Sequence, residues 1–226
     1  MSELAQHSTD YGVVEREPPA TMERNLLIGS RLWASSFVFF FFAFLFAYFY
    51  LRTLNSDHLW HPKGVDPSVT LGALIAAAVV VTAVLLRLAV GHHHADNLRA
   101  WRQKGALALA LVLLALVLQI VEWATQGFGP TDGGFASVFI GWTGLQAIFL
   151  LSFVYWLETT LATSLRYRKV FPAEFSPGEA AGDAHREAPD IRDPLSLVRH
   201  QLEAVSFFAY FLGGEVLVSF VVLYLL

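Results

Sequence analysis

Four polar residues inside or at the end of long apolar runs are the first candidates for chemistry: Arg52, Gln119, Glu122 and Glu215. An ionisable side chain is costly in hydrocarbon, so such residues usually face protein, water or a lipid head group. Gln119 and Glu122 lie three residues apart and share one face of a helix. Arg52 closes its run at a similar depth and would reach a lipid phosphate or Glu122. We expect these residues to tie helices together, to contact a partner subunit or to hold a phospholipid; proton conduction is the alternative.

Metal and haem ligands are missing from the apolar runs. All eight histidines fall in tails, loops or helix ends, and the chain has no cysteine. These absences argue against thiolate metal sites and against a haem held between spans. The run His92-His93-His94 has metal-binding residue types, but successive helical residues diverge by about 100°, so we interpret it as a polar cap. With no nucleophile–base pair apparent, we predict no catalytic residue, no metal site and no cofactor in this chain.

The composition indicates a membrane protein. Of 226 residues, 55% are hydrophobic and only 15% are charged, which is more apolar surface than one soluble core can hide. The formal net charge is −4 and there is no arm rich in lysine and arginine. Nucleic-acid binding, which depends on neutralising phosphates with such residues, is therefore not indicated. We therefore expect the partners of this chain to be membrane components.

Five apolar runs are long enough to cross a bilayer, since about 20 helical residues span a hydrocarbon core of about 30 Å. Backbone groups in lipid need internal partners, so runs of this length should be helices. The sequence predicts an all-α, polytopic membrane protein with a five-helix bundle, and its spans cover about residues 30–51, 69–90, 105–126, 135–165 and 203–226.

The positions of the basic residues predict the orientation in the membrane. With the N-terminus in the cytoplasm, only Arg52 and Lys63 of the 15 lysines and arginines face outward. The C-terminus then lies outside. Residues 1–29 are interpreted as a flexible cytoplasmic tail, and residues 166–202, which are rich in proline and balanced in charge, as a polar cytoplasmic loop.

Two further patterns concern helix packing. The second span carries small residues that permit the close approach of another helix, namely Gly72, Ala73, Ala76, Ala77 and Ala83. The first span carries phenylalanine all round its circumference, which suits lipid on one side and protein on the other. The glycine-rich connection at 127–134 is short, so the third and fourth helices should be antiparallel neighbours.

Several short motifs resemble subunit III of the haem–copper oxidases, in its five-helix form. They are segment 32–52 with Ser35-Ser36, the element Gln119-Ile120-Val121-Glu122-Trp123, the pair Thr143-Gly144, and the run that ends in Tyr224-Leu225-Leu226. The similarity covers most of the chain from about residue 28.

The chain departs from that family at positions where the family has polar residues. Phe37 replaces a membrane glutamate, Gln146 and Phe149 replace two histidines, and Tyr210 and Gly213 replace a histidine and an aspartate. We expect apolar packing in place of a buried polar cluster, an exchange that is near neutral for stability when all members change together. The chain is interpreted as a divergent member.

The resemblance implies a non-catalytic subunit III that stabilises the catalytic subunit and binds phospholipid. Oxygen reduction and proton translocation would occur on oxidase subunits I and II, which would hold the haem and copper. The complex would be hetero-oligomeric and would lie in a bacterial or archaeal plasma membrane. Whether cytochrome c or a quinol donates the electrons stays open.

Two alternatives remain at this point. One lies within the same family, as the accessory subunit of a nitric oxide reductase. The other is a small transporter or channel with Glu122, Glu215 and Arg52 along its path. Against the transporter, the helices lack glycine- or proline-broken midpoints and an inverted repeat.

Overall fold

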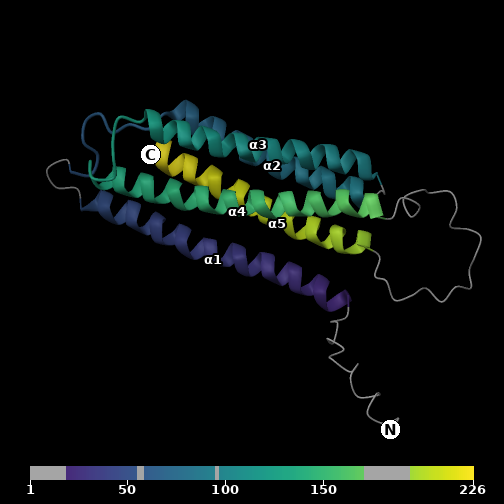
Figure 1. Cartoon of the computed structure of the whole chain (residues 1–226). Helices are drawn as coiled ribbons and strands as arrows, with labels where there is room; N and C mark the ends of the chain where they lie inside the picture. The colour runs from purple at the N-terminus through teal and green to yellow at the C-terminus, as the bar shows by residue number, and fades with distance from the viewer. Residues whose placement is uncertain (1–18, 55–58, 95–96, 171–193) are drawn as a thin grey trace, which may run out of the picture.

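The computed structural model describes residues 19–54, 59–94, 97–170 and 194–226. In these ranges all regular structure is helical: α1 (Pro19–Thr53), α2 (Val69–His94), α3 (Leu98–Thr125), α4 (Gly134–Val170), α5 (Pro194–Phe220) and a final π-helical turn, η1 (Val221–Leu225). The long helices lie side by side, and the start of α1 and the C-terminus are at opposite ends of the bundle (Figure 1). Five of them are long and apolar enough to cross a membrane, which confirms the predicted all-α, five-helix membrane architecture.

The end that holds the C-terminus is called the outer end below, following the predicted orientation. At the inner end the helices are longer than the apolar runs. α1 begins at Pro19 and α4 continues to Val170, while α5 starts at Pro194, so parts of the expected tail 1–29 and loop 166–202 are helical. A helix that begins in lipid can continue into water with polar side chains. The change from apolar to polar residues therefore marks the membrane surface and not the end of the helix. The remainder of both segments lies outside the described residues.

Small residues let neighbouring helices lie close to α2. Ala76 and Ala83 are buried as expected, and a Cβ atom on Gly213 of α5 would lie 3.5 Å from Cβ of Ala83. Toward α3, the Thr82 hydroxyl donates a hydrogen bond of 3.3 Å to the Ala108 carbonyl. Ala73 and Ala77, which we expected to pack in the same way, are exposed. The face of α2 used for packing is therefore narrower than the run of small residues.

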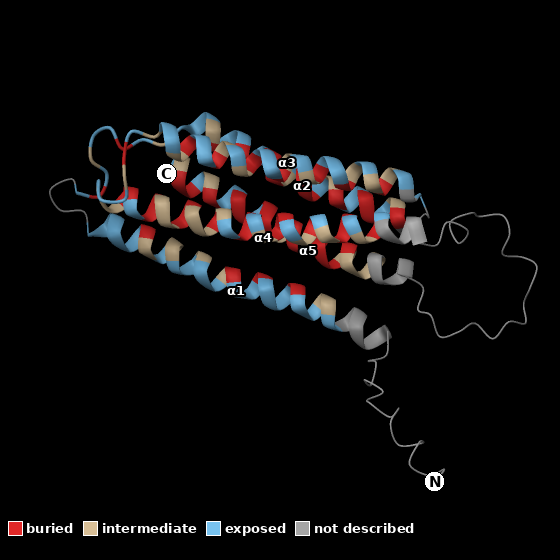
Figure 2. Ribbon diagram, in the orientation of Figure 1, coloured by how far each residue is buried: buried red, intermediate tan, exposed pale blue. Residues whose placement is uncertain are grey.

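The core of the bundle lies between α2, α3, α4 and α5, which carry most of the buried residues (Figure 2). α1 lies at the edge and contacts α4 and α5. Its phenylalanines divide as predicted: Phe37 is 1% exposed inside the bundle, whereas Phe39 and Phe46 are 73% and 69% exposed. α1 therefore presents one face to protein and the others to lipid.

The connections at the outer end are fastened to α4. The backbone N–H of Phe135 donates to the Trp60 carbonyl at 2.8 Å, which joins the α1–α2 connection to the start of α4. Gly133 has φ 122°, and a Cβ atom there would lie 2.7 Å from Cδ of Pro62. Only glycine permits both this conformation and this close approach. The connection between α1 and α2 is thus held against the start of α4 at the outer end.

Candidate functional site

Glu122 lies at the centre of a buried hydrogen-bonded cluster near the outer end of α3. Its Oε2 atom accepts a hydrogen bond of 3.0 Å from Nε2 of Gln119 and one of 2.8 Å from the hydroxyl of Tyr224. Gln119 and Glu122 are each 1% exposed. The structure thus brings together the two residues that their spacing placed on one face, and adds Tyr224, which the residue pattern did not single out as a partner.

The π-helical turn η1 positions Tyr224. Its ring packs on Gly72 of α2, where a Cβ atom would lie 2.5 Å from Cε1 of the ring. The ring of Phe139 meets it edge-on at 5.6 Å, and the ring of Phe220 stacks on it at 5.5 Å. Single π-helical turns are frequent at functional sites. Here the turn, the glycine and the two rings direct the phenol toward Glu122.

Glu215 forms a second buried cluster, between α4 and α5. The indole N–H of Trp142 donates to Oγ of Ser219 at 2.8 Å and lies 3.4 Å from Oε1 of Glu215. The Ser219 hydroxyl also donates to Oε1 of Glu215. Glu215 is 5% exposed, and its second oxygen has no partner among the described residues. Two neutral polar groups, the Trp142 indole and the Ser219 hydroxyl, therefore hold this carboxyl inside the bundle and tie α4 to α5.

A third polar contact links α3 to α4. The indole N–H of Trp123 donates to Oγ1 of Thr143 at 3.0 Å, and the Thr143 hydroxyl donates to the Phe139 carbonyl at 2.8 Å. Both Trp123 and Thr143 belong to the motifs that carried the family resemblance. Each intramembrane hydrogen bond of this kind contributes about 1 kcal/mol. Together the three contacts fix α3, α4 and α5 at the outer half of the bundle.

Arg52 lies apart from these clusters. Its Nη1 atom is 3.4 Å from the Tyr48 hydroxyl and its guanidinium carbon is 5.9 Å from the centre of that ring. No ion pair joins it to Glu122 in the described part of the chain, so the contact considered from the sequence is not formed. Arg52 is exposed and lines an outer pocket of about 340 Å³ together with Trp60, His61 and Tyr224.

Aromatic side chains pack together at two of the five positions where the sequence departs from the family pattern, Phe37 and Phe149. Phe37 stacks on Phe149 with ring centres 4.0 Å apart and meets Phe211 edge-on at 5.5 Å. Trp33 adds edge contacts to Phe149 and Phe208. The expected apolar packing is formed by Phe37 and Phe149, whereas Gln146 is a buried polar residue and Tyr210 is 45% exposed. Each such aromatic pair is worth about 1 kcal/mol beyond its buried area.

The histidines lie apart. His93 is 4% exposed and meets Trp101 edge-on at 5.9 Å, so it packs between α2 and α3 and does not belong to a solvated polar cap. His61 lies 3.6 Å from Asp66 at the outer end, and His200 lies 3.9 Å from Glu203 at the inner end. In the described ranges no three residues of metal-binding type gather at one point.

Comparison with known proteins gives consistent matches. The family model described as cytochrome c oxidase subunit III matches residues 11–173. The chain is 25% identical over 161 residues to cytochrome c oxidase subunit 3 of Tachyglossus aculeatus aculeatus, covering 69% of this chain and 62% of the relative. For that of Struthio camelus the identity is 27% over 58% of this chain and 52% of the relative. For that of Schizophyllum commune it is 26% over 65% and 57%. The matches thus span about half to three-fifths of these relatives.

Proposed function

The chain belongs to the cytochrome c oxidase subunit III family, and from this premise we propose that it is the non-catalytic subunit III of a haem–copper respiratory oxidase. Oxygen reduction and proton translocation then take place on oxidase subunits I and II, which hold the haem and copper. This chain stabilises the catalytic subunit within the membrane and binds phospholipid.

The observation that carries the proposal is that the buried polar side chains form hydrogen bonds within the bundle. Glu122 accepts hydrogen bonds from Gln119 and Tyr224, and Glu215 accepts them from Trp142 and Ser219. These contacts join α3, α4, α5 and η1 to one another inside the bundle. Because these carboxyl groups are buried and hydrogen-bonded within the bundle, a substrate or ion cannot reach them. Their role as contacts between helices supports a rigid scaffold.

We assign the contact with phospholipid to the surface around Arg52, Tyr48 and Trp60 at the outer end of the bundle, called the outer rim below. Arg52 is exposed there beside Tyr48 and Trp60, a combination typical of the membrane interface, and its guanidinium suits a lipid phosphate. Gln119, Glu122 and Glu215 contribute indirectly, because they hold the helices that form the rim. In this proposal Arg52 meets lipid directly and the three buried residues maintain the surface for subunits and lipid.

We assign the complex to a bacterial or archaeal plasma membrane, as the sequence suggested, with the N-terminus in the cytoplasm. The five spans support a multi-pass membrane protein. The relatives compared above come from eukaryotes, so the choice of membrane rests on the sequence interpretation alone.

Purification in mild detergent through a tag on this chain tests the proposal. The proposal predicts that a large histidine-rich membrane subunit co-purifies, that haem absorbance follows that subunit, and that the isolated chain holds neither haem nor stoichiometric copper. A colourless homo-oligomer that contains only this chain would contradict the proposal and would favour a transporter. Co-purification with a nitric oxide-reducing subunit would assign the chain to the related complex.

A further inference from the structure

The inner half of α4 carries a narrow exposed stripe. Between residues 146 and 165 the exposed residues are Ile148, Leu151, Tyr155, Glu158, Ala162 and Leu165. All the remaining residues in this range are buried or half-buried. The spacing of the exposed residues alternates strictly between three and four residues. Two helices that cross with a left-handed twist contact each other through residues at this spacing. The exposed stripe is one residue wide at each helical turn.

Glu158 is unusual within this stripe because it is an exposed carboxylate inside a span. In the described spans it is the only one: Glu122 and Glu215 are buried, and Glu203 is half-buried near His200. Glu158 has no hydrogen bond or ion pair within the described part of the chain. A carboxylate that faced lipid alone would be costly.

The depth of Glu158 follows from the contacts between α3 and α4. A Cβ atom on Gly105 would lie 2.8 Å from Cδ2 of Leu161, and Nη2 of Arg102 donates to the Ser164 carbonyl at 3.1 Å. The helices are antiparallel, so Glu158 is about one turn further into the membrane than Arg102 and Lys104. Lysine and arginine extend long side chains back to the interface, whereas glutamate is too short to do so.

Another exposed helix face differs in composition. On α3 every exposed residue from 106 to 121 is apolar, including Leu114 at 47% and Ile120 at 61%. That face suits lipid, whereas the α4 stripe combines apolar residues with Tyr155 and Glu158.

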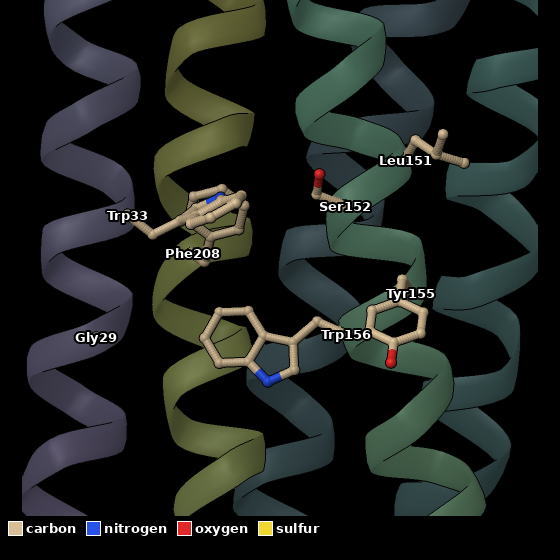
Figure 3. A pocket seen from close by; sticks show the side chains of 7 residues that line it. All are labelled: Gly29, Trp33, Leu151, Ser152, Tyr155, Trp156 and Phe208. Atoms are coloured by element: carbon tan, nitrogen blue, oxygen red, sulfur yellow. The ribbon is translucent and has the colours of Figure 1, made fainter.

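A groove runs beside the stripe. It has a volume of about 540 Å³ and lies between α1, α4 and α5, with walls formed by Trp33, Trp156 and Phe208. Leu151 and Tyr155 border it and project from the same side of α4, while Trp156 turns toward α5 (Figure 3). A large apolar side chain from a helix packed on the stripe has room to enter here.

We propose that the α4 stripe is the docking face for one transmembrane helix of another subunit, which places a cationic or N–H donor side chain opposite Glu158. The inference rests on the proposed function in one respect, that the chain works in a hetero-oligomeric complex. Charge complementarity determines the occupant. A second copy packed symmetrically on the stripe would bring its own Glu158 to the same contact and oppose two carboxylates.

Site-specific photocrosslinking in the whole complex tests this docking face. Benzoylphenylalanine is placed at Tyr155 or at Ala162, and at Leu114 on the apolar face of α3 as the matched control. Adducts with a different membrane subunit from positions 155 and 162, with none from 114, are expected. Adducts from 114 alone, no adduct from any position, or adducts with twice the mass of this chain would each overturn the inference.

Substitution of Glu158 tests the charge. Glu158→Lys should lower the amount of partner subunit retained through purification by about tenfold, because two cations then meet, and Glu158→Gln should lower it less. Equal retention in Glu158→Lys and in the unmodified complex would contradict the pairing. The outcomes separate the two proposals: a haem-containing partner that crosslinks from α3 refutes the docking face only, whereas a colourless preparation refutes the proposed function.

Discussion

Replacing Tyr224 by phenylalanine removes one hydroxyl group and leaves the aromatic packing in place. In the native chain this hydroxyl donates to Oε2 of Glu122 at 2.8 Å, beside the amide of Gln119 at 3.0 Å. The buried carboxyl then keeps one donor of two. Hydrogen bonds between membrane helices contribute about 0.6 kcal/mol on average and up to about 1.7 kcal/mol. Because Glu122 is 1% exposed, water cannot replace the donor readily, so we expect a loss of about 1 kcal/mol in the free energy of unfolding.

The assay is equilibrium unfolding in mixed micelles, with Tyr155→Phe as the matched control. Tyr155 is 70% exposed and its hydroxyl has no hydrogen-bond partner in the described ranges, so this control should change stability by less than about 0.5 kcal/mol. In a Glu122→Leu background, Tyr224→Phe should cost nothing further, because the acceptor is gone. Equal stabilities of the Tyr224→Phe and Tyr155→Phe proteins would refute the assigned hydrogen bond.

Three other substitutions probe the same account. Gly72→Ala should destabilise the chain by about 1–3 kcal/mol, since its Cβ atom would lie 2.5 Å from the Tyr224 ring; Gly214→Ala, with nothing within 4 Å, should be neutral or stabilising in the same unfolding assay. Phe37→Glu should cost more than about 3 kcal/mol, measured as lost thermal stability, because it places a carboxyl among stacked rings. Glu122→Ala should lower retention of this subunit and of bound lipid during purification, while the initial oxygen-reduction rate per complex stays nearly unchanged; normal assembly with collapsed turnover would instead assign Glu122 to a proton route.

The fold was largely predictable because lipid imposes a simple rule. A continuous apolar run must hide its backbone polar groups, so run length predicts each spanning helix. The ends at the inner face were less predictable. Polar residues such as Glu23 and Arg24 in α1, and Arg166 and Lys169 in α4, lie within the helices, since a helix can continue into water without an apolar side.

The candidate site was predictable where both partners lie on one helix. Gln119 and Glu122 are three residues apart, and their hydrogen bond follows from helical spacing. Tyr224 is 102 residues further along the chain, and its position depends on the π-turn and on Gly72. No local pattern encodes that meeting. A buried acid near a small residue on a neighbouring helix is a signal to look for such a partner.

The partners of Arg52 and Glu215 illustrate the same limit. Depth along the chain placed Arg52 level with Glu122, but level residues on different helices need not face each other, and Arg52 lies on Tyr48. Glu215 was recognised as an intramembrane acid, yet its donors Trp142 and Ser219 became apparent only once α4 and α5 were packed together. Burial identifies a costly group, and tertiary packing decides what satisfies it.

Oxygen consumption by the complex before and after removal of this subunit tests the central proposal most directly. If the chain is a non-catalytic scaffold, the depleted complex keeps its full haem content and nearly its full initial rate of oxygen reduction, and then loses activity or dissociates sooner than the intact complex. An immediate loss of the initial rate, with haem content unchanged, would show that this chain takes part in turnover and would contradict the account.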